Sequence, residues 1–200
     1  MPPVLISAAV EGIVGEAVVR TLVSHAGGQL GTVYGKHGKP ALRDKILGYN
    51  NAGRYEPWLV LVDLDADADC APIMRPAWLP KPAQHLCFRI AVRATESWLM
   101  ADADRLATFL GVARSRIPSN PEEAERPKER MVNLARRSRR LDIRADIVPR
   151  ESSGRAEGPA YASRLIEFAE RQWRPGVAAS RSDSLRRAIA CVARLVNSVA

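Results

Sequence analysis

The sequence predicts an α/β protein with a central parallel sheet, helices on both faces of the sheet and a helical C-terminal extension. Residues 58–62 (WLVLV) form an uninterrupted apolar run, which is typical of a strand buried on both faces. Runs of this kind alternate with helical patterns through the first half of the chain, as in βαβ units. We expect residues 1–111 to form the α/β core. Residues 112–200 are expected to form a basic, mostly helical extension packed on that core.

Four strands are expected where apolar runs end in Gly, Pro or acidic residues: 4–10, 29–34, 58–62 and 85–92. Apolar residues at helical spacing predict helices between the strands at 16–25 and 41–51. After the fourth strand, helices are expected near 96, with Thr95 as the cap, and at 104–110. Residues 69–82 are rich in Pro and lack periodicity, so a connecting loop is expected there.

The second half predicts helices with a polar loop between them. A capped helix start is expected at 119–123, a basic helix at 127–140 and a loop at 149–158. Two amphipathic helices are expected at 159–173 and 183–196, packed back on the core.

Composition excludes several classes of protein. The chain has 200 residues, of which 46% are hydrophobic and 26% charged, as in an ordinary globular domain. No run is long enough to span a membrane, and no signal peptide is recognised, so we expect a cytoplasmic protein without a membrane partner. Cys70, Cys87 and Cys191 form no CxxC pair. We therefore expect inert thiols rather than a disulfide framework or a zinc ribbon.

The net charge of +8 is unevenly distributed. Residues 1–100 carry ten Lys and Arg against nine Asp and Glu, whereas residues 101–200 carry twenty against thirteen. Such an asymmetry favours a polyanionic partner, most simply nucleic acid. The alternative is an Arg-rich composition that serves solubility.

Acidic residues follow the central strand at every second position: Asp63, Asp65, Asp67 and Asp69. If the chain stays extended, Asp63 and Asp65 point the same way. Two carboxylates held together repel each other, and a hard divalent cation is the simplest way to neutralise them. The alternative is a solvated acidic loop.

Two further acids follow predicted strands. Glu11 and Gly12 come directly after the first strand, and Glu96 comes shortly after the fourth. Because ligands of open α/β sheets bind at the carboxyl ends of the strands, both acids are candidates for the same site. The alternatives are an ordinary strand-to-helix turn at Gly12 and a helix-dipole role for Glu96.

Basic residues suggest how a polyanion is held. Lys36 and Lys39 lie in a Gly-containing loop, but the first Gly of a GxxxxGK element is missing, so a nucleotide-binding P-loop is rejected. A mobile loop near the site or a plain surface turn remain as interpretations. In the basic helix, phosphate contacts are expected from Arg136, Arg137, Arg139 and Arg140, with a solvated charged face as the alternative.

The combination of a strand followed by Glu11-Gly12, a βαβ unit and a strand followed by Asp63-x-Asp65 resembles the Toprim domain of topoisomerases, primases and overcoming-lysogenization-defect nucleases. The resemblance covers roughly residues 4–102. It implies a Toprim-like, Rossmann-like core in which Glu11, Asp63 and Asp65 hold Mg²⁺ or Mn²⁺, with Asp67 as a further acid. It also implies catalytic roles for these acids in phosphoryl transfer.

A narrower resemblance covers most of the chain. Residues 93–102 (RATESWLMAD) and a late Ser-x-Ser-x-x-Arg element at 182–187 look like small bacterial Toprim-like proteins of unknown function. That group implies an ATPase partner and a part in phage defence, and a homo-oligomer is compatible with it. One position departs from the pattern of overcoming-lysogenization-defect nucleases, which often have a second acid four residues after the first Glu, because Gly15 stands there. Either Glu16 substitutes for that acid or one contribution to metal binding is missing, which argues against two-metal chemistry. Glu96 is a further candidate to compensate.

The function expected from these residues is metal-dependent hydrolysis of nucleic acid. A cation held by the acids would activate water and stabilise the anionic transition state, and Arg93 or a loop lysine would neutralise the phosphate. No tyrosine stands out as a nucleophile, so hydrolysis is preferred to strand passage. Three alternatives remain: a non-catalytic subunit that binds nucleic acid or an ATPase, a haloacid-dehalogenase-like phosphatase, and a nucleotide-sugar transferase.

Overall fold

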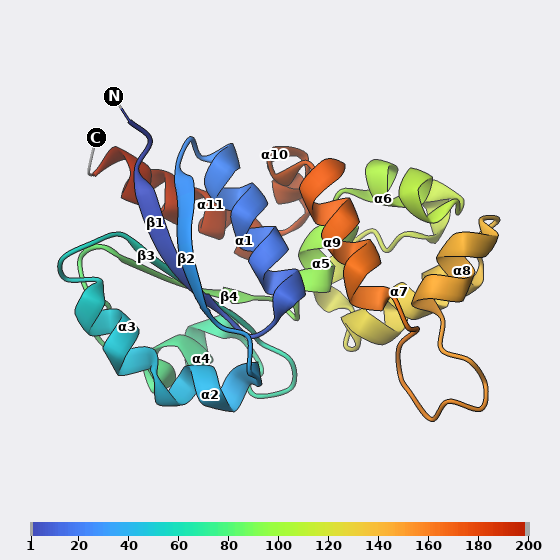
Figure 1. The fold of residues 1–200 in the computed structure, drawn as a ribbon, viewed down its shortest axis with the longest axis horizontal. Helices are drawn as coiled ribbons and strands as arrows, with labels where there is room; N and C mark the ends of the chain where they lie inside the picture. The colour runs from blue at the N-terminus through green and yellow to red at the C-terminus, as the bar shows by residue number, and fades with distance from the viewer. Residues whose placement is uncertain (1, 199–200) are drawn as a thin grey trace.

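The predicted parallel sheet is present in the computed structural model, which describes residues 2–198. Four strands, all parallel, lie in the order β2-β1-β3-β4 (Figure 1). Their bounds are Leu5–Val10 (β1), Gln29–Gly35 (β2), Trp58–Asp63 (β3) and Leu86–Ala91 (β4). Each expected strand is therefore confirmed. Because β1 and β3 are neighbours, the residues that follow them meet at one edge of the sheet.

The central strand β3 is buried on both faces, as its apolar run predicts. Leu59 and Leu61 contribute to the hydrophobic core on one side of the sheet. Val60 and Val62 contribute to the core on the other side. Side chains alternate between the two faces of a strand, so a strand covered on both sides needs apolar residues at every position.

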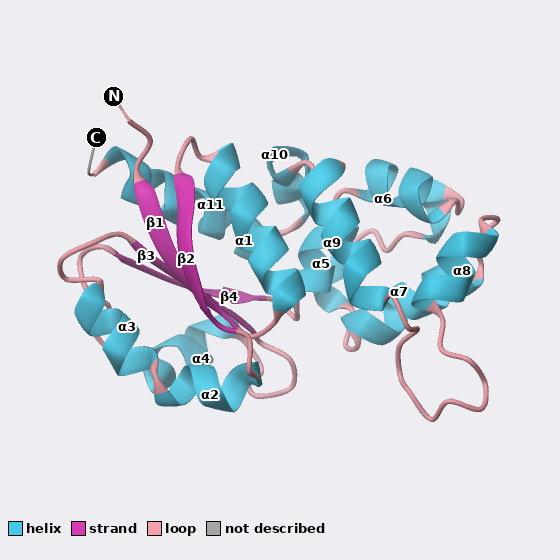
Figure 2. Ribbon diagram, viewed as in Figure 1, coloured by secondary structure: helices cyan, strands magenta, loops and turns pink. Residues whose placement is uncertain are grey.

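Helices cover both faces (Figure 2). Helices α1 (Ile13–His25) and α11 (Asp183–Asn197) pack on one face, through residues such as Leu22 and Val192. Helices α2 (Gly38–Asp44), α3 (Ile46–Ala52) and α4 (Ala71–Trp78) pack on the other, through Leu42, Tyr49 and Met74. The predicted helix at 41–51 is thus two helices that meet at Lys45.

The expected loop at residues 69–82 contains helix α4, so that prediction is wrong for this segment. Pro72 stands in the first turn of α4, where a missing N–H costs nothing. Met74 is buried, and Trp78 stacks on Phe88 of β4 with ring centroids 6.2 Å apart. Packing on the sheet therefore stabilises a helix in a segment whose proline content predicts a loop.

The remaining helices lie beside the sheet (Figure 1). Their bounds are Thr95–Ala101 (α5), Ala103–Leu110 (α6), Pro127–Arg136 (α7), Leu141–Ile147 (α8), Tyr161–Arg171 (α9) and Pro175–Ala178 (α10), with short 3-10 turns at Arg114–Arg116, Pro121–Glu123 and Ala179–Arg181. The expected helix start at 119–123 is only a 3-10 turn. The predicted basic helix ends at Arg136, so Arg137, Arg139 and Arg140 lie outside it.

The extension and the core share one hydrophobic cluster, in which Leu22 of α1, Phe168 of α9 and Leu185 of α11 all take part. Polar contacts reinforce the junction. Asp102, which is 1% exposed, accepts hydrogen bonds from the backbone and side chain of Arg174 at 2.7–3.0 Å. The division at residue 111 remains a prediction.

The late Ser-x-Ser element is a structural junction. Ser182 caps α11 by accepting a hydrogen bond from the Leu185 N–H at 3.2 Å. The Ser184 hydroxyl accepts a hydrogen bond from the indole N–H of Trp98 at 2.7 Å and contacts the Glu122 carboxylate at 2.5 Å. The element therefore joins α11 to α5 and to the 3-10 turn at Pro121–Glu123.

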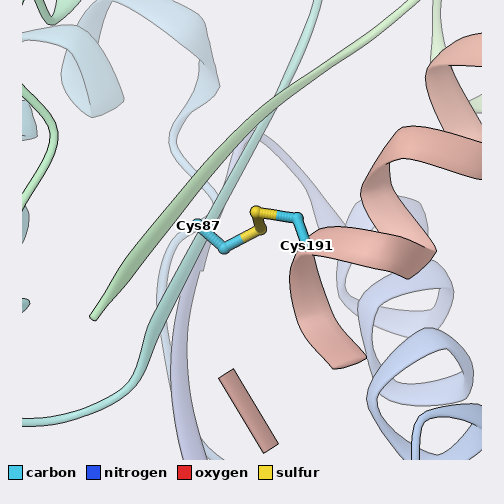
Figure 3. The surroundings of a disulfide bond; sticks show 2 residues. All are labelled: Cys87 and Cys191. Carbon is cyan, nitrogen blue, oxygen red and sulfur yellow. A yellow bond between two sulfur atoms is a disulfide. The ribbon is translucent and has the colours of Figure 1, made fainter. Parts of the chain in front are cut away.

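A disulfide links Cys87 of β4 to Cys191 of α11 (Figure 3). The two Cα atoms lie 5.9 Å apart, and the bridge closes a separation of 104 residues. The expectation of three inert thiols is therefore wrong for this pair, because widely spaced cysteines in the sequence meet when α11 packs on β4. Cys70 is free and partly buried.

Among residues 2–198, no helix has both the length and the apolar character that crossing a membrane requires.

Candidate functional site

Three of the predicted acids converge on one cavity of about 300 Å³. Glu11 follows β1, Asp63 is the last residue of β3, and Glu96 lies in the first turn of α5, which follows β4. The three strands are parallel and adjacent, so their carboxyl ends deliver these side chains to the same edge. We call this space the carboxylate cavity.

Backbone N–H groups hold two of the carboxylates in place. The Asp63 N–H donates to Glu11 Oε1 at 2.7 Å. The Thr95 N–H in turn donates to Asp63 Oδ1 at 2.9 Å. Thr95 is therefore not the helix cap that its sequence context predicts: Ala94 occupies the cap position, and the Thr95 backbone serves the carboxylate. Glu11 and Asp63 thus lie side by side, as the expected strand order requires.

Glu96 is the most deeply buried of the three acids. Its residue is 2% exposed. Tyr161, which begins α9, donates its hydroxyl to Glu96 Oε1 at 3.1 Å, and the Thr95 hydroxyl lies 3.5 Å from Oε2. The helix-dipole alternative predicts an exposed acid in the first turn. The burial and the tyrosine contact instead place Glu96 in the cavity wall.

The protonation of the three acids reflects burial and mutual repulsion. Burial, followed by the charges of Glu96 and Glu11, raises the pKa of Asp63 well above its usual value. Burial likewise raises the pKa of Glu96 and of Glu11. Within residues 2–198, none of the three has a cationic side chain within 4.0 Å. The fold therefore gathers negative charge without neutralising it by a direct ion pair.

Three polar residues of the extension, Lys128, Glu157 and Tyr161, line the cavity, and none of them was singled out from the sequence. Lys128, in the first turn of α7, and Tyr161 both line it. Burial lowers the pKa of Lys128, but the charges of Glu96 and Asp63 outweigh this and raise it overall. Tyr161 is 3% exposed, and burial followed by the charge of Glu96 raises its pKa. Both residues follow a polar loop, and no local pattern connects them to acids more than 30 positions away.

Asp65 and Asp67 do not line this cavity. The chain leaves the extended conformation after Asp63, and Asp65 adopts a left-handed backbone with φ of +50°. Both carboxylates are exposed and form ion pairs with the Lys39 ammonium group, at 2.6 and 2.8 Å. The chain is therefore not extended from Asp63 to Asp65, and the expectation that their side chains point the same way depended on an extended chain. Lys39 lies close to the site but is already paired.

Arg93 supports the loop that carries these two aspartates. Its guanidinium donates to the backbone carbonyl of Asp65 at 3.1 Å and lies 3.5 Å from that of Ala68. The Asp65 N–H donates to the Arg93 carbonyl at 2.8 Å. Arg93 thus fixes the path of the chain after β3, and its expected role at a phosphate stays a prediction.

The departure at Gly15 has a clear structural consequence. Gly15 lines the carboxylate cavity without contributing a ligand. Glu16 points elsewhere: it pairs with Arg20 at 3.0 Å and with Lys36 at 3.1 Å. Of the two residues that were candidates to compensate, only Glu96 lies in the cavity.

The arginines of the predicted basic helix lie away from the carboxylate cavity. Lys128 is near the start of α7 and Arg136 is its last residue, so they are about 12 Å apart along the axis at 1.5 Å per residue. Arg136, Arg137 and Arg139 are exposed. Arg140 pairs with Asp142 at 2.7 Å and donates to the Phe109 carbonyl at 3.1 Å. None of these arginines lines the carboxylate cavity.

The donor chemistry of the cavity suits a hard divalent cation, because carboxylate oxygens are the preferred ligands of Mg²⁺. A preformed set of ligands is absent, however: within residues 2–198, no three His, Cys, Asp or Glu side chains are grouped so that they could hold a metal ion. Mg²⁺ commonly uses only one or two carboxylates and keeps several waters. Glu11 and Asp63 satisfy that smaller requirement.

Comparisons of the chain with protein-family models, with curated proteins and with solved structures found no match in any of the three.

Proposed function

We propose that the carboxylate cavity binds Mg²⁺ or Mn²⁺ and that the protein hydrolyses phosphodiester bonds of nucleic acid. One observation carries the proposal. Glu11, Asp63 and Glu96 converge from three chain segments on one cavity, with raised pKa values and no ion pair. Bringing like charges together is unfavourable, and a bound divalent cation is the simplest group that offsets it.

The residues of the cavity have distinct roles in this proposal. Glu11 and Asp63 would hold the cation, and Glu96 would orient or deprotonate water within the cavity, where Tyr161 fixes its carboxylate. A cation bound there would lower the pKa of a coordinated water and offset charge on the phosphate. Lys128, at the cavity wall, would neutralise a non-bridging phosphate oxygen.

Nucleic acid is the proposed substrate because of the charge in the second half of the chain. Residues 101–200 carry twenty Lys and Arg against thirteen Asp and Glu. Arg136, Arg137 and Arg139 are exposed close to the end of α7, the helix that also carries Lys128. A phosphate backbone running along α7 would contact both.

The wider setting is proposed from the resemblance of the sequence to Toprim proteins. The Glu11 and Asp63 positions and the parallel sheet agree with that pattern, whereas Asp65 and Gly15 depart from it. A Toprim-like enzyme of this kind would act in the cytoplasm beside an ATPase partner, in defence against phage.

Nicking of supercoiled plasmid and cleavage of labelled RNA, each with Mg²⁺ or Mn²⁺, test the proposal. We expect cleavage by the wild type and a loss of cleavage rate of more than about 100-fold in Asp63→Asn and Glu11→Gln. Removing a metal ligand should reduce activity at least as much as removing a residue that orients a ligand. Asp44→Asn is the matched control, since Asp44 is exposed and lies outside the carboxylate cavity. Cleavage that survives in both cavity variants would contradict the proposal.

A non-catalytic subunit is the second candidate, favoured by Gly15 and by the outward direction of Glu16. Such a subunit would bind the cation and nucleic acid without cutting. Metal binding detected by calorimetry, together with no cleavage of DNA or RNA in either cation, would select this candidate.

A further inference from the structure

A second cavity, of about 560 Å³, lies against β4, the edge strand of the sheet. Its walls come from α4, from β4 and from the start of α11, and it shares no lining residue with the carboxylate cavity. We call it the arginine pocket, because Arg75, Arg89 and Arg187 line it from three different elements. Nothing in the proposed hydrolysis uses these residues.

Two of the three arginines lack a counter-charge. Within residues 2–198, Arg75 and Arg89 have no carboxylate within 4.0 Å, whereas Arg187 pairs with Asp183 at 2.6 Å. Within the same residues, the Nε atom of Arg89 is buried and has no hydrogen-bond partner. A buried guanidinium N–H without an acceptor is costly, and proteins usually satisfy such a group with a partner or a ligand.

Two of the three acids on the same walls, Glu122 and Asp183, are already engaged, whereas Asp69 forms no ion pair among residues 2–198. Glu122 accepts hydrogen bonds from Ser182 at 2.6 Å and from the Ser184 N–H at 3.0 Å. Asp183 pairs with Arg186 and Arg187. Two guanidinium groups without an ion pair, those of Arg75 and Arg89, therefore line the pocket with one such carboxylate, that of Asp69, which leaves an excess of positive charge.

The pKa of Arg89 reports the same imbalance. Burial, and then the like charges of Arg75 and Arg187, lower it to about 10. An anion bound in the pocket would offset the electrostatic repulsion among the three guanidinium groups.

Much of the remaining lining is apolar. Phe88, Leu79, Pro72 and Pro76 contribute to the walls. The volume falls within the range of sites for small organic ligands, which combine apolar walls with a few fixed polar groups. A purely inorganic anion would leave these walls in contact with water.

We propose that the arginine pocket binds a small phosphate monoester with a flat apolar body, such as a nucleoside monophosphate. The two guanidinium groups without an ion pair can each pair with separate oxygens of a phosphate monoester, which offers more acceptor oxygens than a carboxylate. The planar N–H fork of Arg also pairs with phosphate oxygens in a bidentate manner. The ring of the ligand would lie against Pro72 and Pro76, which are exposed.

Calorimetric titration of the full chain with adenosine 5′-monophosphate tests this site. We expect saturable binding, at least tenfold weaker binding of adenosine or inorganic phosphate alone, and at least a tenfold loss in Arg89→Met and in Arg75→Gln. Arg54→Gln, a change at an exposed arginine outside the pocket, is the matched control and should leave the affinity unchanged. A short oligonucleotide with and without a 5′-phosphate separates a free nucleotide from a nucleic-acid end as the source of the phosphate.

Thermal unfolding separates a binding role from a structural one. A guanidinium without partners does not stabilise the fold, so Arg89→Met should unfold at the same temperature as the wild type or higher. Glu11→Gln should leave the nucleotide affinity unchanged, which keeps this test independent of the proposed hydrolysis. No saturable binding at millimolar nucleotide, or equal losses in Arg89→Met and Arg54→Gln, would overturn the proposal.

Discussion

The carboxylate cavity and the arginine pocket both draw on the segment that runs from β4 into α5, and they bury charge of opposite sign. Thr95 and Glu96 line the first, whereas Arg89 and Val92 line the second. Burial raises the pKa of Glu96 and lowers that of Arg89, so each site disfavours its own charge. A fold that holds like charges together at two places gains stability from ligands of opposite charge at each.

The two cavities differ in what completes them. The carboxylate cavity is completed by Tyr161 and Lys128, which belong to α9 and α7. The arginine pocket is closed by α11, which the Cys87–Cys191 disulfide holds against β4. Substitutions in the extension should therefore affect one cavity more than the other. Ligand titrations of such variants test whether the two cavities are independent.

The disulfide has the largest expected effect on stability. Cys191→Ser opens a link between residues 104 positions apart, and we expect a loss of about 4 kcal/mol in the free energy of unfolding, since a cross-link of that span restricts the unfolded chain strongly. Urea unfolding of the oxidised protein measures it, and Cys70→Ser is the control.

The same variant should separate the two cavities. With α11 released, nucleotide affinity at the arginine pocket should fall more than metal affinity at the carboxylate cavity. Equal losses at both sites would show that the cavities are not independent.

Tyr161→Phe tests the support of Glu96. The substitution removes the hydrogen bond of 3.1 Å to a buried carboxylate, and we expect a loss of about 2 kcal/mol. It should also weaken metal binding while leaving nucleotide binding unchanged. Guanidinium denaturation and the two titrations measure these effects, and an unchanged stability would place Glu96 in its neutral form with another partner.

The pH dependence of stability should distinguish Asp63 from an ordinary acid. Its pKa is raised in the folded state, so its contribution is fully present below the unfolded pKa and is lost as the pH rises through the folded one. Without metal, Asp63→Asn should match the wild type near pH 3.5 and exceed it in melting temperature at pH 8. A wild type that is the more stable protein at pH 8 would contradict the repulsion inferred for this site.

Lys39→Met has the smallest expected effect. Its partners Asp65 and Asp67 are about half exposed, and ion pairs of this kind contribute between 0 and about 1 kcal/mol. Metal affinity should stay within about twofold if Glu11 and Asp63 are the ligands. A rise of tenfold or more would show that Lys39 competes with the cation for Asp65 and Asp67.

Most of the sheet could be predicted from the sequence because its strands carry a strong local signal. The apolar run of β3 and the acids after β1 and β3 identify which chain ends meet at one edge. Helix α4 could not be predicted, since Pro72 and Pro76 mask a helix that depends on packing against Phe88.

The site was predictable where residues follow strands and unpredictable where they arrive from elsewhere. Glu11 and Asp63 were found by position alone. Lys128 and Tyr161 reach the cavity through the packing of α7 and α9, which no local pattern encodes. The turn at Asp65, with its positive φ, depends on Arg93 and Lys39, which lie at least 26 positions away along the chain.

Binding of Mn²⁺ to the metal-free protein at pH 7.5, followed by calorimetry, tests the central claim most directly. We predict saturable binding of one cation per chain by the wild type, at least a tenfold loss of affinity in Asp63→Asn, and no change in Asp67→Asn. The carboxylate cavity would then be a metal site that uses Asp63 and not the exposed acids. Binding that is absent in the wild type, or that survives in Asp63→Asn and disappears in Asp67→Asn, would contradict it.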